Sequence, residues 1–472
     1  MSSIRVCAIT TDCYPEDPLV RRTAEAAASG GYEYHVICSM RDGQTKYELF
    51  NGVHVHRVRI RGRKGKPLGR ISARPLHEML VLWSLFALLA FWKVARLHAK
   101  LKFDVVHVHN LPDFLVFSAL IPKILGARVI LEVQDVAPEL MAAKGKGIFR
   151  ETTVTLAEWQ ERVSTVFADH VLTVGWPFEQ PLLKRGVPPE KLSSVLNSAD
   201  PKIFPEEKRS APFLGEATAE RPIILMYHGT VAERHGLDIA MRAFAKARNA
   251  APHLRLHLRG GGDGLPRLEQ LAQALDVADA VTFTPIGPLE KVADFIAQGD
   301  IGIIPYRSDG FMDMVLPTKS YEFAWMRRPM IASNTVAIRS LFRPSSVRLC
   351  EPSNVDSFAE AIIDLYHDPR KRARLVAGAA QDYEPYRWEI MAERYCQLIG
   401  SLARKRAQQK RFGEGPENHL LVTPLGRLGC LNAEGENVTL GYARQPEETA
   451  ITFRGGNLHP GDLANLDEDG FI

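Results

Sequence analysis

The order of apolar and polar positions predicts a regular alternation of strands and helices over the first 200 residues. Short apolar runs, as long as buried strands, are separated by longer runs in which apolar residues recur at helical spacing. The predicted strands cover 4–10, 34–38, 53–60, 103–108, 128–133 and 170–174, and the predicted helices cover 20–29, 76–99, 113–125 and 154–167. Strands that alternate with helices in this way predict a parallel sheet covered on both faces.

A second alternation of the same kind follows a stretch without periodicity. Residues 201–221 are rich in proline and charge and predict an interdomain linker. Beyond it, strands are predicted at 223–227, 254–258, 280–283, 301–305 and 330–333, and helices at 237–249, 265–275, 289–298 and 318–327. We therefore expect an α/β protein with two doubly wound, Rossmann-like domains, 1–200 and 222–385, that face each other across a cleft. Ligands of such sheets bind beyond the carboxyl ends of the strands.

The end of the chain has two different textures. Residues 386–409 form a long helical pattern that ends in cationic residues, which the helix dipole favours. Residues 410–472 are rich in glycine, proline, asparagine and glutamate at hairpin-like spacing, and they predict a short β-rich appendage.

Composition narrows the class of protein. The chain has 472 residues, 46% of them hydrophobic and 24% charged, which is ordinary for two or three globular domains. Its six cysteines show no metal-binding or paired spacing, which argues against a zinc site or a disulfide framework and favours the cytoplasm. The first residues lack the layout of a secretory signal. A net charge of +4 gives little reason to expect a nucleic acid partner.

One segment of the first domain suggests that the protein contacts a membrane. Residues 57–74 read RVRIRGRKGKPLGRISAR, with many cations and no acid, and residues 79–92 follow as MLVLWSLFALLAFW. The apolar run is shorter than the roughly 20 residues that a membrane-spanning helix needs. It is either a core helix after a solvated basic loop, or a peripheral contact of 57–92 with an anionic membrane, with Trp83 and Trp92 at the interface.

Loops of the second domain suit a diphosphate group. YHGT at 227–230 ends a strand and leads through Arg234, His235 and Gly236 into a helix. The N-terminus of that helix offers free N–H groups to an anion. A second turn, GGGDG at 260–264, follows the next strand and has room for a nucleotide. Each loop alone is weak evidence, because a glycine-rich turn is more often only a turn.

The strongest local pattern is LPTKSYEF at 316–323. Pro317 and Thr318 predict a helix start, with Thr318 as the N-cap, so that the following amides face the cleft. Glu322 lies one turn into this helix, where a carboxylate can accept hydrogen bonds from both hydroxyls of a ribose. If the pattern stood alone, a solvated helix glutamate would be the simpler explanation.

Taken in order, these patterns resemble the retaining GT-B glycosyltransferases of the family 4 type (group 1 glycosyltransferases). DVVHVH at 104–109 resembles a first-domain strand end of the family, and VLNSAD at 195–200 with Phe204 resembles its IPNGVD segment. Residues 227–236 resemble its phosphate loop, and residues 319–333 its KxxEYxAxGxPVIAS helix and strand. The resemblance covers about 4–409. It implies a GT-B fold, in which 386–409 crosses back to the first domain, and an enzyme of the hexosyltransferase type.

The resemblance also implies the reaction. A sugar would move from a nucleotide-sugar donor to a glycan or lipid-linked acceptor with retention of anomeric configuration. Neither a metal ion nor a cofactor is expected, because side chains and helix dipoles stabilise the leaving diphosphate. The leaving phosphate itself would guide an attack on the same face of the sugar, so that no protein nucleophile is required.

Particular residues receive roles from the same resemblance. His109, Arg234 and Lys319 would be the catalytic set, with His109 in contact with the transferred sugar. A core or capping histidine is the alternative for His109. The remaining residues are, on the donor side, Gly229, Thr230, Gly262 and Glu322, together with Arg234 and Lys319, and, on the acceptor side, Asp135 and Glu139.

Several positions depart from the family pattern. Met314 stands where the first glutamate of the E-x7-E motif is expected, between Asp309 and Asp313 on one side and the helix on the other. Thr230 and His235 occupy the places of the arginine and lysine of the phosphate loop, and Arg234 would compensate for the lost lysine. Arg328 replaces a glycine before the last strand of the motif. These substitutions leave the contacts to the donor sugar open.

Residues 426–472 resemble a fragment of the adenylate-forming, AMP-binding enzymes. The segments GY at 441–442, GD at 461–462 and DEDG at 467–470 match that family in order, and Asp462 would correspond to its ribose-binding aspartate. The phosphate loop and the adenine pocket of those enzymes are absent from the sequence. A fragment of this size could not close an active site, so we expect no ligase activity.

Two other functions remain as alternatives from the sequence. One is another enzyme on the same fold, a sugar-nucleotide epimerase or a glycoside phosphorylase. The other is a degenerate, non-catalytic glycan-binding protein, which Met314, Thr230 and His235 would explain. For the glycosyltransferase we expect a cytoplasmic location, with or without peripheral contact to the inner face of the cell membrane.

Overall fold

The computed structural model describes residues 3–60, 76–144, 150–413, 453–454 and 457–458. The chain forms two compact units, 1–407 and 408–472. Both large sheets belong to the first unit. In the second unit, the described residues beyond the end of the last helix form two short antiparallel strands, β15 (Phe453–Arg454) and β16 (Asn457–Leu458). The segment expected to resemble adenylate-forming enzymes, Asp462 included, otherwise lies outside the described residues.

The first sheet has eight strands in the order β3-β4-β2-β1-β5-β6-β7-β8. All neighbours pair in parallel except the edge strand β3, which forms an antiparallel hairpin with β4. The strands are β1 (Arg5–Ile9), β2 (Glu33–Ser39), β3 (Tyr47–Phe50), β4 (Val53–Val58), β5 (Val105–His109), β6 (Arg128–Val133), β7 (His170–Thr173) and β8 (Leu192–Ser194).

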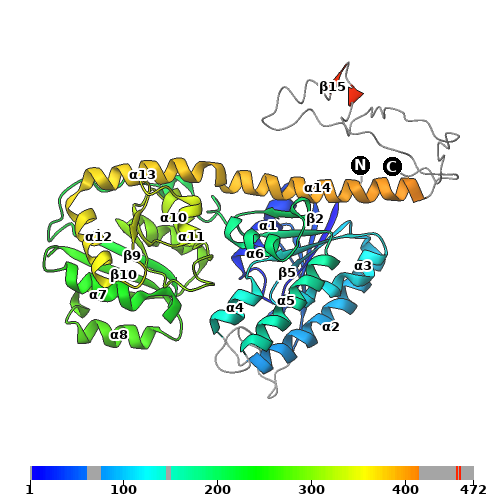
Figure 1. Ribbon diagram of the computed structural model, residues 1–472, viewed down its shortest axis with the longest axis horizontal. Coiled ribbons are helices and arrows are strands. Elements are labelled where there is room, and N and C mark those ends of the chain that lie inside the picture. The colour runs from blue at the N-terminus through cyan, green and yellow to red at the C-terminus, as the bar shows by residue number, and fades with distance from the viewer. Residues whose placement is uncertain (1–2, 61–75, 145–149, 414–452, 455–456, 459–472) are drawn as a thin grey trace. The chain divides into compact units, whose positions relative to one another are not determined.

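Helices cover both faces of this sheet (Figure 1). Successive residues of a strand point to opposite faces. In β5, Val105 therefore packs with one core cluster, which includes residues of α1 (Pro18–Ser29) and α14 (Trp388–Gly413). Val106 packs with another, which includes residues of α2 (Leu76–Leu101). The helices of this half are α1 (Pro18–Ser29), α2 (Leu76–Leu101), the 3-10 helix η2 (Asp113–Ala119), α3 (Leu120–Ile124), α4 (Ala137–Lys144), α5 (Arg150–Phe167) and α6 (Trp176–Lys184).

The second sheet has six strands in the order β11-β10-β9-β12-β13-β14, all parallel. Its strands are β9 (Ile223–Thr230), β10 (Leu254–Gly261), β11 (Val281–Pro285), β12 (Ile301–Ile304), β13 (Met330–Ser333) and β14 (Arg348–Cys350). Its helices are α7 (Leu237–Ala247), α8 (Leu265–Ala274), α9 (Val292–Gln298), α10 (Thr318–Trp325), α11 (Val336–Leu341), α12 (Val355–His367) and α13 (Pro369–Tyr383). The strand order reverses between β9 and β12, and such a switch point is where doubly wound sheets bind ligands.

The last long helix, α14 (Trp388–Gly413), follows the second sheet in sequence but packs on the first. Tyr32 donates a hydrogen bond from its hydroxyl to the Cys396 carbonyl (3.0 Å). The Leu196 amide, in the segment after β8, lies 3.4 Å from the Met391 sulfur. The end of the chain's globular part is thus anchored to its beginning.

The predicted α/β fold with parallel sheets is confirmed, and most predicted elements agree within a few residues. The predicted helix at 113–125 is instead η2 followed by the short helix α3. The prediction that Thr318 caps α10 is wrong. Pro317 is the N-cap, with extended backbone angles and without a side-chain cap, and Thr318 is already helical.

Helix α2 is apolar on its exposed side as well as on its buried side. Phe86, Ala90 and Val94 are fully buried against the sheet, while the opposite side of the helix is apolar and exposed. By length and composition, Glu78–Leu101 would be able to cross a membrane, with a mean hydropathy of 1.7, and 28% of its apolar window is buried. The expectation that Trp83 lies at a membrane interface is wrong, because Trp83 packs in a small core cluster with Met79.

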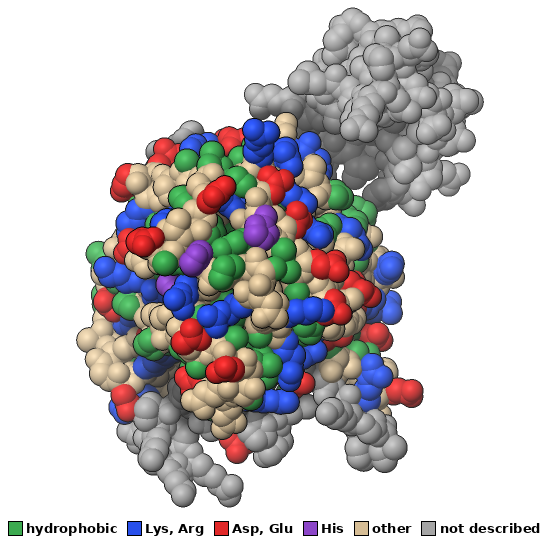
Figure 2. Space-filling model, turned by 90° about the vertical axis from the view of Figure 1, so that its left-hand side faces the viewer, with side chains coloured by type: hydrophobic (Ala, Val, Ile, Leu, Met, Phe, Trp, Pro, Cys, Tyr) green, Lys and Arg blue, Asp and Glu red, His purple; other side chains and the backbone are tan. Residues whose placement is uncertain are grey.

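Charges are mixed on the face of the molecule seen in Figure 2, where lysine and arginine alternate with aspartate and glutamate. A long basic stripe of the kind that tracks a nucleic acid backbone is not formed on this face by the described residues.

Candidate functional site

The carboxyl end of β9 and the loop that follows it, residues 227–236, are shaped by glycines and by bonds to their own backbone. Gly229 and Gly236 have φ angles of 117° and 64°, which side-chain-bearing residues rarely adopt. A Cβ on Gly236 would lie 1.9 Å from the Pro305 carbonyl oxygen. The Tyr227 hydroxyl donates to the Thr230 carbonyl oxygen (2.6 Å), and His235 Nδ1 lies 2.8 Å from the same oxygen. The loop is therefore fixed in place with little side-chain cover.

Lys319, in the first turn of α10, brings a buried cation to this loop. Its Nζ donates to the Tyr306 hydroxyl (2.7 Å) and lies between the rings of Tyr227 and Tyr306, 4.8 and 4.7 Å from their centroids. A Cβ built on Gly229 would be 3.8 Å from Nζ, so the amine reaches the open part of the loop. No carboxylate of the described residues forms an ion pair with Lys319. A buried cation without a carboxylate partner is prepared to receive an anion.

Glu322 lies one turn further along α10 and is buried, in contrast to the solvated glutamate considered above. His228 Nε2 is 3.1 Å from Glu322 Oε2, and Arg22 Nη2 is 3.8 Å from Oε1. Burial raises the pKa of Glu322, and the charges of Arg22 and Lys319 oppose this rise. Burial also lowers the pKa of His228 to about 3, so that this ring is neutral. Oε2 has no hydrogen-bond partner with suitable geometry among the described residues.

His109 ends β5 at the carboxyl edge of the first sheet. Its ring is buried, with Nδ1 3.1 Å from Glu132 Oε2 on β6. Nε2, on the other side of the ring, has no hydrogen-bond partner among the described residues. Asp17 caps α1. Burial, with a smaller effect of Asp12, raises the pKa of Asp17 to about 6, and the neighbouring His109 opposes this rise.

Arg22 on α1 links Glu322 to the first half of the chain. Its side chain is 2% exposed and donates to the Asn197 carbonyl oxygen (3.2 Å), with a further bond to the Asn197 side chain. Burial lowers the pKa of Arg22, and the negative charge of Glu322 opposes this change. The carboxylate on α10 and the segment after β8 thus share one buried cation.

The acceptor-side candidates differ in their surroundings. Asp135 follows β6, and its backbone is held by Asn110, whose amide donates to the Asp135 carbonyl oxygen (2.7 Å). Glu139 accepts two hydrogen bonds from Arg185 (2.6 and 3.3 Å), which also binds Glu161. The Glu139 carboxylate is thus already engaged within the first half, and its role in acceptor orientation remains a prediction.

Two other donor-side candidates, Arg234 and Gly262, lie in the loops that follow β9 and β10. Arg234 is exposed, and its charge influences the pKa of Tyr227 and of His235. Gly262 follows β10 with a φ of 155°, and a Cβ there would lie 2.2 Å from the Val231 carbonyl oxygen. Any other residue at this position would collide with the strand-end loop of β9.

The structure accounts for two of the departures from the family pattern. Arg328 is buried and donates to the carbonyl oxygens of Ile296, Ala297 and Ser210, so it ties the linker to the second sheet. His235 stacks on Tyr306 with centroids 4.9 Å apart, and burial lowers its pKa to about 3, so it supplies no positive charge. Met314 is half-buried and packs against the core of the first sheet.

One group of described residues has the donor atoms of a metal site. His107, His109 and Glu132 are all buried, and one ligand atom of each lies within 4.8 Å of the others. His107 Nε2 is 2.9 Å from Glu132 Oε2. Donor type and spacing alone would also suit a network of buried polar side chains without a metal ion.

Sequence reasoning missed Arg22, Tyr306, Glu132 and Asn197. The available signal was an arginine within the apolar face of a predicted helix, since Arg22 is followed by the buried Ala24 and Ala27. Glu132 likewise interrupts a strand that is otherwise apolar on both faces. A charged residue in such a strand is expected to have a partner or a function.

Two family models match the chain. Residues 18–197 match a glycosyl transferase 4-like domain, and residues 222–368 match the model named glycosyl transferases group 1. The α-D-kanosaminyltransferase of Streptomyces kanamyceticus is 24% identical over 273 residues, which are 56% of this chain and 68% of the relative. The GDP-mannose-dependent α-(1-6)-phosphatidylinositol monomannoside mannosyltransferase of Mycolicibacterium smegmatis is 28% identical over 197 residues, 40% of this chain and 50% of the relative.

A D-inositol 3-phosphate glycosyltransferase of Rhodococcus opacus is 27% identical over 242 residues, 49% of this chain and 52% of the relative. The chain thus spans about half the length of these last two relatives. Among solved structures, sucrose-phosphate synthase of Thermosynechococcus elongatus superposes with a TM-score of 0.66 at 19% identity and covers 85% of this chain and 100% of that one. HepE of Anabaena, in complex with UDP and glucose, gives 0.61 at 13% identity, with 84% and 100% coverage.

Proposed function

The chain belongs to the glycosyltransferases with a GT-B fold, and we propose that it transfers a sugar from a nucleotide-sugar donor to a glycan or lipid-linked acceptor, with retention and without a metal ion. The observation that carries the donor site is the Lys319 amine, buried beneath the open glycine loop after β9. Among the described residues, no carboxylate forms an ion pair with this cation, which therefore suits the phosphates of a nucleoside diphosphate.

The diphosphate would be stabilised by three elements. Lys319 supplies the buried charge, Arg234 a second charge at the loop mouth, and the loop glycine Gly229 leaves backbone amides accessible. Negative charge grows on the diphosphate as the glycosidic bond breaks, so fixed cations lower the barrier more than they strengthen ground-state binding. This arrangement replaces the divalent ion that other nucleotide-sugar enzymes use.

The ribose would bind at Glu322. Its Oε2 is available for a hydroxyl, and Arg22 and Lys319 favour the ionised carboxylate that would accept two such bonds. His109 would contact the transferred sugar through Nε2, which has no hydrogen-bond partner in the part of the chain that the structure describes. Retention follows, in this proposal, from attack of the acceptor on the face that the leaving phosphate vacates.

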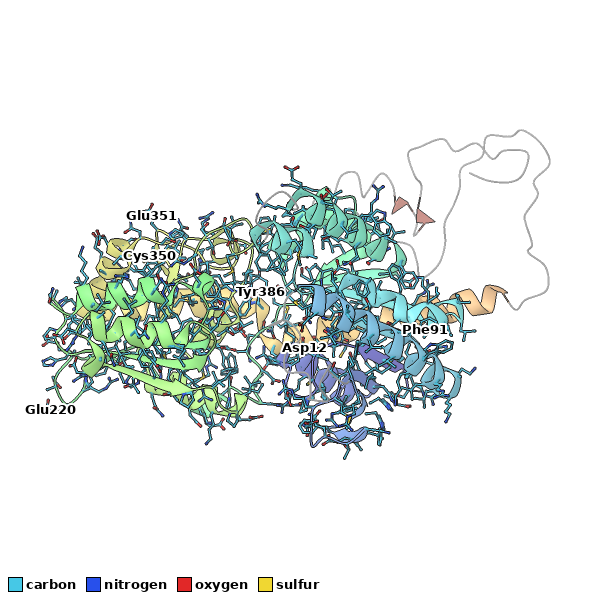
Figure 3. All side chains as sticks on the ribbon, turned by 90° about the horizontal axis from the view of Figure 1, so that it is seen from below. Asp12, Phe91, Glu220, Cys350, Glu351 and Tyr386 are labelled. Atoms are coloured by element: carbon cyan, nitrogen blue, oxygen red, sulfur yellow. The ribbon has the colours of Figure 1, made fainter. Side chains whose placement is uncertain are left out.

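A membrane-bound acceptor is supported by the outer surface of the first half. On α2, Val81, Leu85, Leu88 and Trp92 form a stripe at helical spacing and are 67, 40, 56 and 60% exposed. Figure 3 labels Phe91 on this helix, whose ring meets the Trp92 ring edge-on at 5.3 Å. An apolar stripe that faces outward along a helix is unusual for a protein surrounded by water.

Helix α5 carries a second stripe of the same kind. Leu156, Trp159, Val163 and Val166 are exposed, while its buried residues are Ala157, Glu161, Ser164 and Thr165. The polarity of this helix is therefore the reverse of that expected for a surface helix. Helix α3 adds the exposed Ile124 and lies beside α2 (Figure 1). We name the exposed apolar residues of α2, α3 and α5 the apolar face.

The occupant that suits the apolar face is an anionic membrane. The segment 57–74, just before α2 in sequence, contains many cations and no acid. Apolar side chains enter the boundary of the bilayer, and adjacent cations bind its headgroups. The enzyme would act at the inner surface of the cell membrane, where a lipid-linked acceptor is held.

Calorimetry with UDP-, GDP- and ADP-sugars tests the donor site directly. One nucleotide series should bind, and Lys319→Met should reduce turnover by about 100-fold, the effect of losing one preorganised donor to a developing anion. Lys291→Met is the matched control, since Lys291 is an exposed lysine of the same half. Assays with EDTA should retain full activity, and NMR of the product should give the donor's anomeric configuration. If none of the nucleotide series binds, the donor site does not exist.

A further inference from the structure

A stripe of polar side chains crosses the face of the first sheet that packs against α1 and α14. In a parallel sheet with helices on both sides, these positions are normally apolar, as Val105 and Ile130 are. Their neighbours on the same face, His107 and His109 on β5 and Glu132 on β6, are nevertheless only 0, 1 and 3% exposed. A buried polar group costs stability unless it has a partner, so this stripe requires an explanation.

The register of the strands brings the three side chains together. His107 and His109 are two positions apart on β5 and therefore point to the same face, with ring centroids 4.1 Å apart. Glu132 is the partner of His109 on the neighbouring strand. One nitrogen of each ring and one carboxylate oxygen lie within 4.8 Å of one another. The three residues thus present their ligand atoms to one small volume inside the protein.

The closest atoms of this group do not form a hydrogen bond. His107 Nε2 is 2.9 Å from Glu132 Oε2, yet both are buried atoms without a hydrogen-bond partner among the residues that the structure describes. Two polar atoms this close that do not bond to each other are explained if their lone pairs point at a common third atom. Ligands of one zinc ion, each about 2.0–2.1 Å from the metal, are separated by roughly 3–3.5 Å. The separation of these two atoms is close to that range.

His109 completes the set through Nδ1, which is 3.1 Å from the same oxygen of Glu132. The amide nitrogen of Gln134 lies 3.0 Å from Nδ1 and can only donate, so Nδ1 carries a lone pair and not a proton. A neutral imidazole nitrogen with a lone pair is the form that binds a metal ion. With an ion present, Gln134 would give up this bond and keep its bond to the other oxygen of Glu132 (3.3 Å).

The surroundings of His107 are those of a metal-bound histidine. Such a residue binds the metal through one ring nitrogen and almost always donates a hydrogen bond from the other. His107 Nδ1 is 2.7 Å from the Tyr395 hydroxyl on α14, which is in turn 2.7 Å from the Tyr34 hydroxyl. Donation from His107 to Tyr395 and from Tyr395 to Tyr34 leaves the lone pair of Nε2 for an ion.

We propose that His107 Nε2, His109 Nδ1 and Glu132 Oε2 bind one divalent transition-metal ion of the zinc class between the first sheet and α14. Two imidazoles and one carboxylate suit Zn²⁺, whereas Mg²⁺ and Ca²⁺ prefer oxygen ligands. None of the three ligands is a cysteine, so the cysteine spacing that argues against a zinc site does not bear on them. An ion on Nδ1 would leave the proton of His109 on Nε2, as a donor to the transferred sugar. Only this last consequence rests on the proposed function.

The proposed ion is separate from the donor diphosphate. The cations assigned to the diphosphate, Lys319 and Arg234, belong to the second half of the chain, whereas all three ligands of the ion belong to the first sheet. Because the ligands are buried, we expect the ion to exchange slowly. A brief assay with EDTA therefore still reports on the diphosphate, and removal of the ion requires prolonged dialysis against a small chelator such as 1,10-phenanthroline.

Titration of the full-length protein with Zn²⁺ tests the proposal. After dialysis against 1,10-phenanthroline and then against metal-free buffer, calorimetry should show one site per chain with a Kd below about 1 μM. Glu132→Gln and His107→Gln each remove a ligand and should weaken binding by at least about 100-fold, since loss of an outer partner alone costs about 10- to 100-fold. Tyr395→Phe removes only the outer partner of His107 and should weaken binding by about 10-fold.

His54→Gln is the matched control. His54 belongs to a second group of neighbouring histidines in the first sheet, where its ring stacks on that of His35 with centroids 4.5 Å apart. This group would be the place where Zn²⁺ binds histidines non-specifically. The His54→Gln protein should bind Zn²⁺ as tightly as the unmodified protein.

The proposal is overturned if the unmodified protein has no tight Zn²⁺ site, or if folded Glu132→Gln and His107→Gln bind Zn²⁺ as tightly as the unmodified protein. Loss of the site in His54→Gln would also overturn it and would indicate an adventitious ion only. Should Glu132→Gln and His107→Gln fail to fold, an unchanged affinity in Tyr395→Phe decides against the site. The titration contains no nucleotide sugar, so a failure to bind any donor would refute the proposed function and leave this result intact.

Discussion

Arg22 on α1 and Glu322 on α10 face each other across the two halves of the chain, with Nη2 and Oε1 3.8 Å apart and both side chains buried. Arg22 also bonds to Asn197, just before the linker. The carboxylate proposed to bind the donor ribose is therefore held by a cation of the opposite half. Arg22 therefore contributes both to the proposed donor site and to the contact between the two halves.

Arg22→Met should destabilise the protein by about 2–4 kcal/mol, because it leaves the buried Glu322 without its nearest cation from the first half. Adding Glu322→Gln should recover part of this loss, since a neutral amide needs no counter-charge. Urea unfolding of the single and double variants measures the coupling. Lys246→Met is the control: Lys246 pairs with Asp356, both side chains are exposed (58 and 67%), and such surface pairs contribute little. Equal losses from Lys246→Met and Arg22→Met would contradict the link.

Gly236→Ala should lower both stability and nucleotide affinity. The added Cβ would meet the Pro305 carbonyl oxygen at 1.9 Å, in a left-handed backbone conformation that alanine avoids. We expect a loss of about 1–3 kcal/mol in the free energy of unfolding and weaker binding of the diphosphate. Gly310→Ala, with nothing within 4 Å of its Cβ, should change stability by less than about 0.5 kcal/mol. A Gly236→Ala protein with normal affinity would show that the loop geometry does not matter.

Asp113 should make the protein less stable as the pH rises from about 4 to 6. Burial raises its pKa to about 6, against hydrogen bonds from Asn110 and Gln160. The folded protein holds this proton to a higher pH than the unfolded chain, whose carboxyl has a pKa near 3.9. Ionisation thus costs stability across this window, and above pH 6 the cost is constant.

Asp113→Asn should therefore gain about 2–3 kcal/mol relative to the unmodified protein between pH 4 and 7, as measured by unfolding at each pH. Asp169→Asn serves as the opposite case. Although burial opposes it, Lys123 and Arg128 lower the pKa of Asp169, so its carboxylate stabilises the fold at neutral pH and loses this effect in acid. A pH-independent difference for Asp113→Asn would show that Asp113 stays ionised or stays protonated throughout.

Trp92→Ser and Trp159→Ser should each reduce binding to anionic vesicles in flotation by about tenfold, since burying an apolar side chain contributes about 1.5–3 kcal/mol. Vesicles without anionic lipid should bind more weakly than anionic ones, because the basic segment would lose its partner. Leu214→Ser is the control, as an exposed leucine in the linker and outside the apolar face. If both variants bind anionic vesicles as well as the unmodified protein does, the apolar face has no membrane role.

Much of the fold was predictable because the apolar pattern within a single segment indicates which faces of a strand are buried. In β6, the run from Val129 to Val133 is apolar at nearly every position, which indicates a strand covered on both faces. Local signals were less informative where two elements merge, so the 113–125 segment was predicted as one helix. The start of α10 was misassigned because Pro317 and Thr318 both suit a helix start, and only the backbone shows which one caps it.

Of the candidate site, the sequence by itself determined the residues that belong to single loops and helices. The loop at Gly229, the lysine and glutamate of α10 and the strand end at His109 follow from local order, since the carboxyl ends of parallel strands share one edge. Tertiary structure alone decided that Arg22 meets Glu322, that Tyr395 reaches His107, and that the stripes of α2 and α5 face outward. The physical reason is that periodicity records how a segment divides into faces, whereas the partner of each face is chosen by packing between distant parts of the chain.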